Sequence, residues 1–273
     1  MGAARSYISA RLPPSVMARL RAVKRYLVRA DWIDEAEIFA RVADERGMPS
    51  GSMLVDVGAH CGAVTALFLD KGWSVVAYEP DPINRERFKQ HIGPNPRVKL
   101  SDSAVSDKAA ESVSLFTSPV STGVSTLAPF HESHTPTCKI RVVTLADDLR
   151  ARGIRYVDFL KIDIEGFDYF ALRGFDWDYA PRFVLYEFED RKTVPLGYSL
   201  SDSSGYMAGR GYHIVYSIWE PIVEYGMQHR WRGLFLTPPS DIESCWGNVL
   251  CFREKDDAAL CMATFSPRTF RLF

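Results

Sequence analysis

The sequence lacks the features that mark several special classes of protein. No apolar run approaches the roughly 20 residues that a membrane-spanning helix needs. We also expect no signal peptide, because the N-terminal region has no suitable apolar stretch. The five cysteines are odd in number and form no C-x-x-C pair, which favours free thiols in a reducing, cytoplasmic compartment. The formal net charge of −1 gives no reason to expect nucleic acid as a partner.

What is present is ordinary for a soluble globular protein. The chain has 273 residues, of which 47% are hydrophobic and 25% charged, enough to bury a sizeable core without disulfides or metals. The charge is unevenly spread, because residues 1–30 hold seven Lys or Arg and no acid. This basic face belongs to a helix predicted within residues 15–46. It either contacts an anionic membrane or packs on the domain or on a second copy of the chain, and we favour packing.

From residue 53 onward, short apolar runs alternate with amphipathic stretches. This pattern predicts βαβ units and a mostly parallel α/β sheet. Two segments interrupt it: residues 112–144, predicted as a hairpin insertion, and residues 218–247, which show no periodicity. Long irregular segments in a compact domain are often functional loops or lids. The predicted strands cover residues 53–57, 73–78, 98–100, 157–162, 183–188, 212–217 and 249–252.

A glycine-containing loop follows the first predicted strand. Its spacing is D-x-G-x-x-x-G, from Asp56 through Gly58 to Gly62, and it includes His60. Dinucleotide folds place a glycine loop at this point, but with the spacing G-x-G-x-x-G. The acid before the first glycine would repel a pyrophosphate and would suit a ligand that carries an ammonium group. S-adenosylmethionine (SAM) is such a ligand. Taken alone, the loop is equally consistent with a tight turn.

Two further strand ends complete the predicted cofactor site. Glu79 ends the second strand, at the place where an acid accepts hydrogen bonds from ribose hydroxyls. Ser103 and Ala104 follow the third strand, where the adenine edge is expected. Taken alone, Glu79 is also consistent with a solvated acid at a strand end. The candidate cofactor-binding residues on these segments are Asp56, Gly58, His60, Gly62, Glu79, Pro80, Ser103 and Ala104.

Carboxylates gather at the ends of the next two predicted strands. Asp163 and Glu165 follow one strand, and Glu187 and Glu189 end the next. Adjacent parallel strands deliver their carboxyl ends to one crevice, so these acids would form a general base or bind a cation such as Mg²⁺. Alternatively, Lys161 and Arg191 neutralise them. The catalytic candidates are Asp163, Glu165, Glu187 and His229, and the metal candidates are Asp163, Glu165 and Glu187.

Together these segments resemble the FkbM family of SAM-dependent methyltransferases over roughly residues 52–190. The resemblance implies a class I methyltransferase sheet of seven strands whose last strand is antiparallel. It also implies O-methylation of hydroxyls on sugars or polyketide-type compounds. Asp56, Gly58 and Gly62 would hold the methionine part of SAM, Glu79 the ribose, and Asp163 the site near the methyl group. The resemblance rests on the blocks Val55–Gly62, Tyr78–Pro82, Val143–Leu145 with Asp147, and Lys161–Gly166.

The resemblance also sets the expected organisation. We predict an N-terminal helical extension over 1–50, a methyltransferase domain over 51–255 with acceptor-side insertions, and a C-terminal tail over 256–273. The late aromatic segment resembles a branch of the family found among surface-polysaccharide genes, so a sugar or glycan is the expected acceptor. An oligomer and a peripheral membrane contact stay open. Two alternatives are a non-catalytic SAM- or nucleotide-binding protein and an NAD(P)-dependent oxidoreductase, the latter disfavoured by Asp56 and the missing G-x-G-x-x-G.

Overall fold

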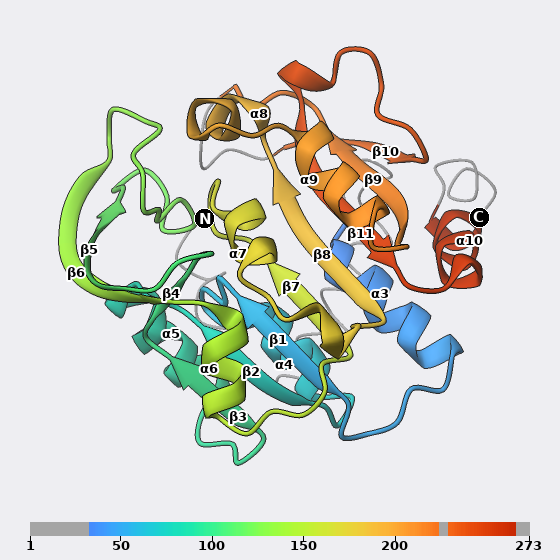
Figure 1. The fold of residues 1–273 in the computed structure, drawn as a ribbon, viewed down its shortest axis with the longest axis horizontal. Helices are drawn as coiled ribbons and strands as arrows, with labels where there is room; N and C mark the ends of the chain where they lie inside the picture. The colour runs from blue at the N-terminus through green and yellow to red at the C-terminus, as the bar shows by residue number, and fades with distance from the viewer. Residues whose placement is uncertain (1–32, 224–228, 266–273) are drawn as a thin grey trace, which may run out of the picture.

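An eight-stranded sheet forms the centre of the protein (Figure 1). The computed structural model describes residues 33–223 and 229–265. Five neighbouring strands run parallel, and β11 is antiparallel to both of its neighbours. In spatial order the strands are β3 (Val98–Ser101), β2 (Ser74–Tyr78), β1 (Met53–Val57), β7 (Phe159–Ile162), β8 (Phe183–Phe188), β11 (Trp246–Phe252), β9 (His213–Trp219) and β10 (Trp231–Phe235).

This arrangement confirms the predicted α/β sheet of the class I methyltransferase type, with its last strand antiparallel. The predicted number of seven strands is wrong, since the described residues place eight in this sheet. The extra strand, β10, comes from the segment that shows no periodicity. It pairs with the end of β9, with Trp231 opposite Trp219, and its register shifts between Trp231 and Gly233. That shift hides the alternation by which a strand is recognised.

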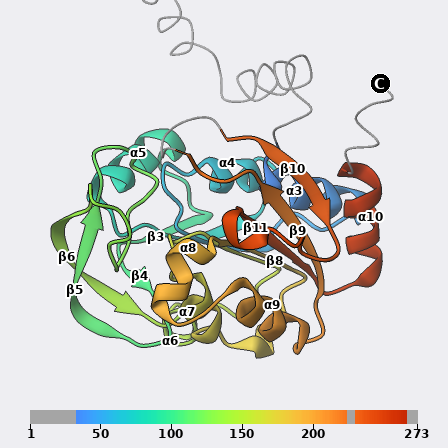
Figure 2. The same cartoon turned by 90° about the horizontal axis from the view of Figure 1, so that it is seen from above.

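Helices cover both faces of the sheet, as Figure 2 shows. Alternating strand residues face opposite layers, so Leu54 packs with one core and Val55 with the other. On the Leu54 side lie α3 (Glu35–Glu45), α4 (Ala63–Leu69), α5 (Pro82–Ile92) and α10 (Lys255–Phe265). On the Val55 side lie α6 (Leu145–Ala151), α7 (Asp168–Arg173) and α9 (Leu200–Ala208). The short helix α8 (Asp190–Thr193) directly follows β8.

The insertion near residues 112–144 is a hairpin, as predicted. Strands β5 (Ala110–Thr117) and β6 (Thr135–Val143) pair antiparallel, and β4 (Ala104–Val105) joins β6 to give a separate three-stranded sheet. A small apolar cluster of its own, with Leu115 and Ile140, holds this sheet together. The connection over residues 118–134, which we call the lid, reaches back to the carboxyl ends of the main strands.

The predicted N-terminal extension is described only from residue 33 onward. Its helix α3 is capped by the Asp34 carboxylate, which accepts the Ala36 backbone N–H. The basic segment of residues 1–30 and the end of the tail lie outside the described residues. Among the described helices, none is long and apolar enough to cross a membrane. The five cysteines are free thiols, in agreement with the prediction.

Candidate active site

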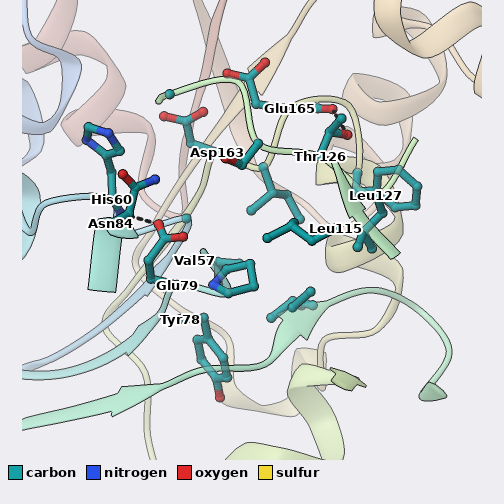
Figure 3. A pocket seen from close by; sticks show the side chains of 18 of the residues that line it. Val57, His60, Tyr78, Glu79, Asn84, Leu115, Thr126, Leu127, Asp163 and Glu165 are labelled. Atoms are coloured by element: carbon teal, nitrogen blue, oxygen red, sulfur yellow. Dashed lines mark hydrogen bonds between the residues drawn. The ribbon is translucent and has the colours of Figure 1, made fainter. Parts of the chain in front are cut away.

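A cavity of about 320 Å³ lies at the carboxyl ends of β1, β2, β7 and β8 (Figure 3). The described residues that line it include four carboxylates and no lysine or arginine. A pyrophosphate would find no cationic side chain in this wall, whereas a ligand with positive charge meets acids on two sides. The four acids are Glu79, Asp163, Glu165 and Glu187.

The loop after β1 forms one wall, and Gly58 is essential to its shape. Gly58 has φ +76°, and a Cβ added there would lie 1.8 Å from the carbonyl oxygen of Asp163. The N–H groups of Gly58 and Ala59 both donate to the Tyr78 carbonyl at 3.0 Å, which ties this loop to β2. His60 follows with φ +50° and lines the cavity. Burial lowers the pKa of His60, so its imidazole is neutral at pH 7.

Glu79 projects into the cavity from the end of β2. Only 4% of the residue is exposed, and each carboxylate oxygen accepts one backbone N–H at 2.8 Å, from His60 and from Asp81. Burial raises the pKa of Glu79 to about 7, although both hydrogen bonds oppose the shift. Each oxygen retains acceptor capacity toward the cavity. Glu79 is therefore built to accept a pair of hydroxyl hydrogens.

The neighbouring wall is mainly apolar. Pro80, Ser103 and Ala104 line it together with larger apolar side chains from β2 and the hairpin insertion. Ser103 is buried, and its backbone N–H donates to the Ser101 hydroxyl at 3.4 Å. This wall has the composition that an aromatic base requires, with apolar faces and a few polar groups at the edge. The larger apolar side chains are Tyr78, Val105, Leu115 and Leu127.

The structure does not bring Asp56 and Gly62 to the cavity wall. Asp56 is fully buried, where it accepts the Thr65 hydroxyl at 2.7 Å and pairs with the Lys161 ammonium at 3.4 Å. Gly62 begins α4 with φ +81°, and a Cβ there would lie 2.9 Å from the Phe88 ring. Both residues support the loop from the side that faces away from the cavity.

Lys161 connects Asp56 to the cavity. Its ammonium donates to the Gly58 carbonyl at 2.7 Å and lies 3.7 Å from an oxygen of Asp163, whose side chain is 47% exposed. Burial alone would lower the pKa of Lys161, but the carboxylates of Asp56 and Asp163 outweigh it and raise that pKa. A charged lysine therefore holds the glycine loop and Asp163 together. Of the four acids that Lys161 was expected to help neutralise, Asp163 is the one it contacts.

Three acids that the sequence singled out meet on the opposite wall. We call Asp163, Glu165 and Glu187 the carboxylate cluster, because one oxygen of each lies within 4.8 Å of the others. Burial raises the pKa of Glu165 and, more strongly, that of Glu187, while Lys192 opposes both shifts. Glu165 has φ +57°, a strained backbone conformation for a residue with a side chain. Burial and the nearby ammonium thus act in opposite directions on the ionisation of Glu165 and Glu187.

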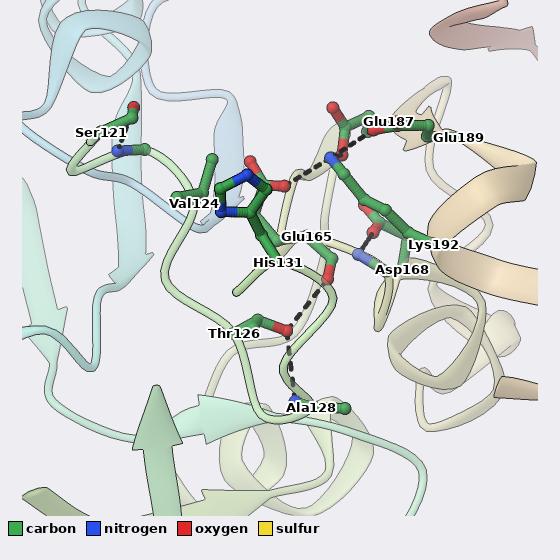
Figure 4. Close-up of polar contacts among 12 residues, drawn as sticks. Ser121, Val124, Thr126, Ala128, His131, Glu165, Asp168, Glu187, Glu189 and Lys192 are labelled. Carbon is green, nitrogen blue, oxygen red and sulfur yellow. Dashed lines mark hydrogen bonds and ion pairs between the residues drawn. The ribbon is translucent and has the colours of Figure 1, made fainter. Parts of the chain in front are cut away.

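The sequence interpretation missed Lys192, which lies among these acids (Figure 4). Its ammonium is 2.5 Å from Glu165, 3.4 Å from Glu187 and 2.8 Å from Glu189, and its side chain is 3% exposed. Arg191, the predicted neutralising partner, is exposed. The position of Lys192 three residues after Glu189 is the one local signal that sequence offers for this pairing.

The lid covers the cavity and is bonded to its rim. The Asn84 amide donates to the Thr122 carbonyl at 2.9 Å, and a His60 ring nitrogen lies 3.1 Å from the Thr122 hydroxyl. Further along, the Thr126 hydroxyl donates to the Glu165 carbonyl at 3.0 Å. The hairpin insertion therefore contacts the loops after β1 and β7 and the helix that follows Glu79. It belongs to the site.

His229 lies outside the cavity wall. Its ring packs edge-on against Trp246 at 5.0 Å between centroids, and Trp246 stacks on Trp219 at 5.4 Å. Trp246 lines the main cavity and also a second cavity of about 240 Å³. Burial lowers the pKa of His229, so this imidazole is neutral at pH 7 and available to accept a proton.

Comparison with known proteins matches the chain to one protein family. A family model described as the methyltransferase FkbM domain matches residues 56–214, which is more than half of the chain. No curated protein matches the chain.

Several solved structures show a distant likeness. A precorrin-6y C5,15-methyltransferase from Geobacter metallireducens is 10% identical, with a TM-score of 0.41, covering 80% of this chain and 88% of that one. An rRNA methylase from Streptococcus thermophilus is also 10% identical, with a TM-score of 0.40 and coverages of 80% and 93%. A TehB-like SAM-dependent methyltransferase from Corynebacterium glutamicum is 14% identical, with a TM-score of 0.37 and coverages of 88% and 100%. These likenesses are too distant to carry a conclusion about the substrate.

Proposed function

The chain belongs to the FkbM family of methyltransferases, and from this premise we propose that it methylates a hydroxyl group of a sugar, polysaccharide or related natural product. Family membership makes SAM the methyl donor. The observation that carries the proposal is that Glu79 and the carboxylate cluster line the same cavity. One side of that cavity suits a nucleoside, and the other suits a hydroxyl that must lose a proton.

The cavity fits SAM better than it fits a dinucleotide. Its wall holds four carboxylates and, among the described residues, no cationic side chain. SAM carries a sulfonium and an ammonium group and no phosphate, so its charge complements this wall. Glu79 would accept the ribose hydroxyls, and Ser103 and Ala104 would border the adenine. Asp56 would act indirectly, through its ion pair with Lys161 at 3.4 Å.

Bound SAM supplies an already activated methyl group. The remaining task of the protein is to align an acceptor oxygen and to remove its proton during attack. Glu187 and Glu165 are the candidate bases, because both line the cavity and burial raises the pKa of each above its ordinary value. Asp163 borders the place expected for the methyl group. His229 is a second candidate base, and it would have to act across Trp246.

A divalent cation at the carboxylate cluster is the remaining cofactor prediction. The donor oxygens lie within 4.8 Å of one another, and carboxylates are the ligands that Mg²⁺ prefers. Against this, the Lys192 ammonium already bonds Glu165 at 2.5 Å and Glu187 at 3.4 Å. The residues present therefore fit a metal poorly, and we route no step of the reaction through one.

The first test is calorimetric titration of SAM and S-adenosylhomocysteine, with NAD as the competing ligand. We expect the wild type to bind both adenosyl compounds and Glu79→Ala to lose most of that binding. Glu86→Ala, which removes an exposed acid from α5, serves as the matched control. Binding of NAD in place of SAM would favour an oxidoreductase. Adenosyl binding without methyl transfer to any acceptor would favour a non-catalytic binding protein.

The second test measures transfer of labelled methyl groups from SAM to a panel of oligosaccharides and hydroxylated natural products. With an accepted substrate in hand, Glu165→Gln and Glu187→Gln are expected to lower kcat while S-adenosylhomocysteine affinity stays unchanged. Full turnover in both variants would refute a carboxylate base and leave His229→Gln as the variant to measure.

A cytoplasmic location, oligomerisation and contact with a membrane surface stay proposals. The basic segment that motivates the membrane contact lies outside the described residues. Liposome flotation of the full chain against a truncation from Ile33 tests it. Equal flotation of the two chains would end the membrane proposal.

A further inference from the structure

Lys192 has an unusual setting for a lysine. Its ammonium contacts three glutamates, at 2.5 Å to Glu165, 2.8 Å to Glu189 and 3.4 Å to Glu187. The ring of Phe130, from the lid, lies 5.0 Å from the same nitrogen. An ammonium has three N–H donors, so three carboxylates match its bonding capacity. The aromatic face adds a cation–π contact.

The charge balance around this ammonium explains why it stays protonated. Burial alone would lower the pKa of Lys192, but the three carboxylates outweigh burial and hold that pKa well above its ordinary value. Without the ammonium, the buried carboxyl groups of Glu165, Glu187 and Glu189 would face one another with no cation among them. Lys192 thus offsets the mutual repulsion of three closely spaced carboxyl groups in a buried site.

The same ammonium contacts two of the three carboxylates that a metal ion would share. A divalent cation binds carboxylate oxygens at about 2.0–2.6 Å. Glu165 and Glu187, two of the three candidate metal ligands, already contact Lys192 at 2.5 and 3.4 Å. A metal shared by these two oxygens would lie within a few ångströms of a positive charge in a buried site, where repulsion is strong. Lysine and metal therefore compete for one position.

We propose that Lys192 is the resident cation of the acceptor site, and that its ammonium replaces a divalent metal in orienting Glu165 and Glu187 toward the cavity. Lys192 is a positioning residue, since it does not line the cavity and acts through the two glutamates that do. The interpretation of this site as the acceptor site rests on the proposed function. The position of the Lys192 ammonium is independent of that function, so it can be tested without an acceptor.

The experiment titrates Mn²⁺ alone into the full-length protein and measures binding by electron paramagnetic resonance and calorimetry. We expect no specific binding by the wild type. Lys192→Ala removes the ammonium and leaves the carboxylate cluster, so it is expected to gain one specific Mn²⁺ site that the wild type lacks. The double variant Lys192→Ala/Glu165→Gln is expected to lose that binding. Lys89→Ala, which removes an exposed lysine on α5, is the matched control and should behave as wild type.

Two results would overturn the proposal. One is Mn²⁺ binding by the wild type that Glu165→Gln abolishes, because metal and ammonium would then coexist. The other is a folded Lys192→Ala variant that gains no Mn²⁺ site. Circular dichroism reports whether each variant is folded, and S-adenosylhomocysteine binding, measured in parallel, reports whether the cofactor prediction holds, so failure of either proposal is seen separately. If Lys192→Ala does not fold, Lys192→Ala/Glu189→Gln removes one charge of each sign and takes its place.

Discussion

Proton uptake by Glu79 should control the affinity for the ribose of the cofactor. Burial raises the pKa of Glu79 to about 7, so in the ligand-free protein this carboxyl group is about half protonated at neutral pH. Both of its oxygens already accept a backbone N–H at 2.8 Å. Only the ionised form has enough acceptor capacity left to take two further hydroxyl hydrogens. Binding of the ribose should therefore release a proton from Glu79.

The size of the effect follows from the pKa of about 7. If only the ionised form binds, the dissociation constant at pH 6 is about tenfold higher than at pH 8. The sign is fixed by the direction of the shift, because raising the pH deprotonates Glu79 and so strengthens binding. Glu79→Gln cannot ionise and supplies one oxygen acceptor in place of two. Its affinity should fall by roughly tenfold or more and should not depend on pH in this range.

The suitable probe is 5′-methylthioadenosine, which has the ribose and adenine of SAM but no amino-acid group that titrates. Calorimetry at pH 6, 7 and 8, in buffers of different ionisation enthalpy, gives both the affinity and the number of protons released. His60 lies beside Glu79 and also lines the cavity, so His60→Gln serves as the control for its titration. A pH-independent affinity in the wild type, or the same pH dependence in Glu79→Gln, would refute the reasoning.

Two further predictions concern the glycine loop after β1 and the buried ion pairs of Asp257. Gly58→Ala should abolish S-adenosylhomocysteine binding, because its Cβ would lie 1.8 Å from the Asp163 carbonyl at φ +76°; retention of wild-type affinity in calorimetry would contradict this. Asp257→Ala should lower the free energy of unfolding by about 2–4 kcal/mol in urea titrations, since the fully buried carboxylate pairs with Arg46 and Arg182, each at 2.7 Å. A loss below about 0.5 kcal/mol would show that water compensates the two arginines.

The sequence predicted the parts of the site that follow from parallel strands. Glu79, Asp163 and Glu187 each end a strand of this sheet, and the carboxyl ends of neighbouring parallel strands meet at one edge. The position of Asp56 was harder to predict. It shares a strand face with Leu54, toward α4, and only the contact with Lys161 of the adjacent strand decides that it lies behind the wall.

The parts that could not be predicted depend on contacts between distant segments. Lys192 reaches the carboxylate cluster because α8 turns back over the end of β8, and no local periodicity encodes that turn. Strand β10 forms by pairing with β9 across an irregular register. The lid reaches Glu165 from Thr126, 39 positions earlier in the chain. Such pairings arise from tertiary packing and leave no signal within a short window of sequence.

The contacts of the lid have a consequence for the entry and release of ligands. Four hydrogen bonds join Thr122 and Thr126 to the rim of the cavity and to α5, and a fifth joins Ser125 to Asp81. Each contributes about 0.5–1.5 kcal/mol net, so releasing all five would cost roughly 5 kcal/mol and leave on the order of 0.01–0.1% of molecules open at any moment. The lid is therefore closed in almost all molecules, so it shields the cavity from water, and ligands exchange only when these bonds are released together.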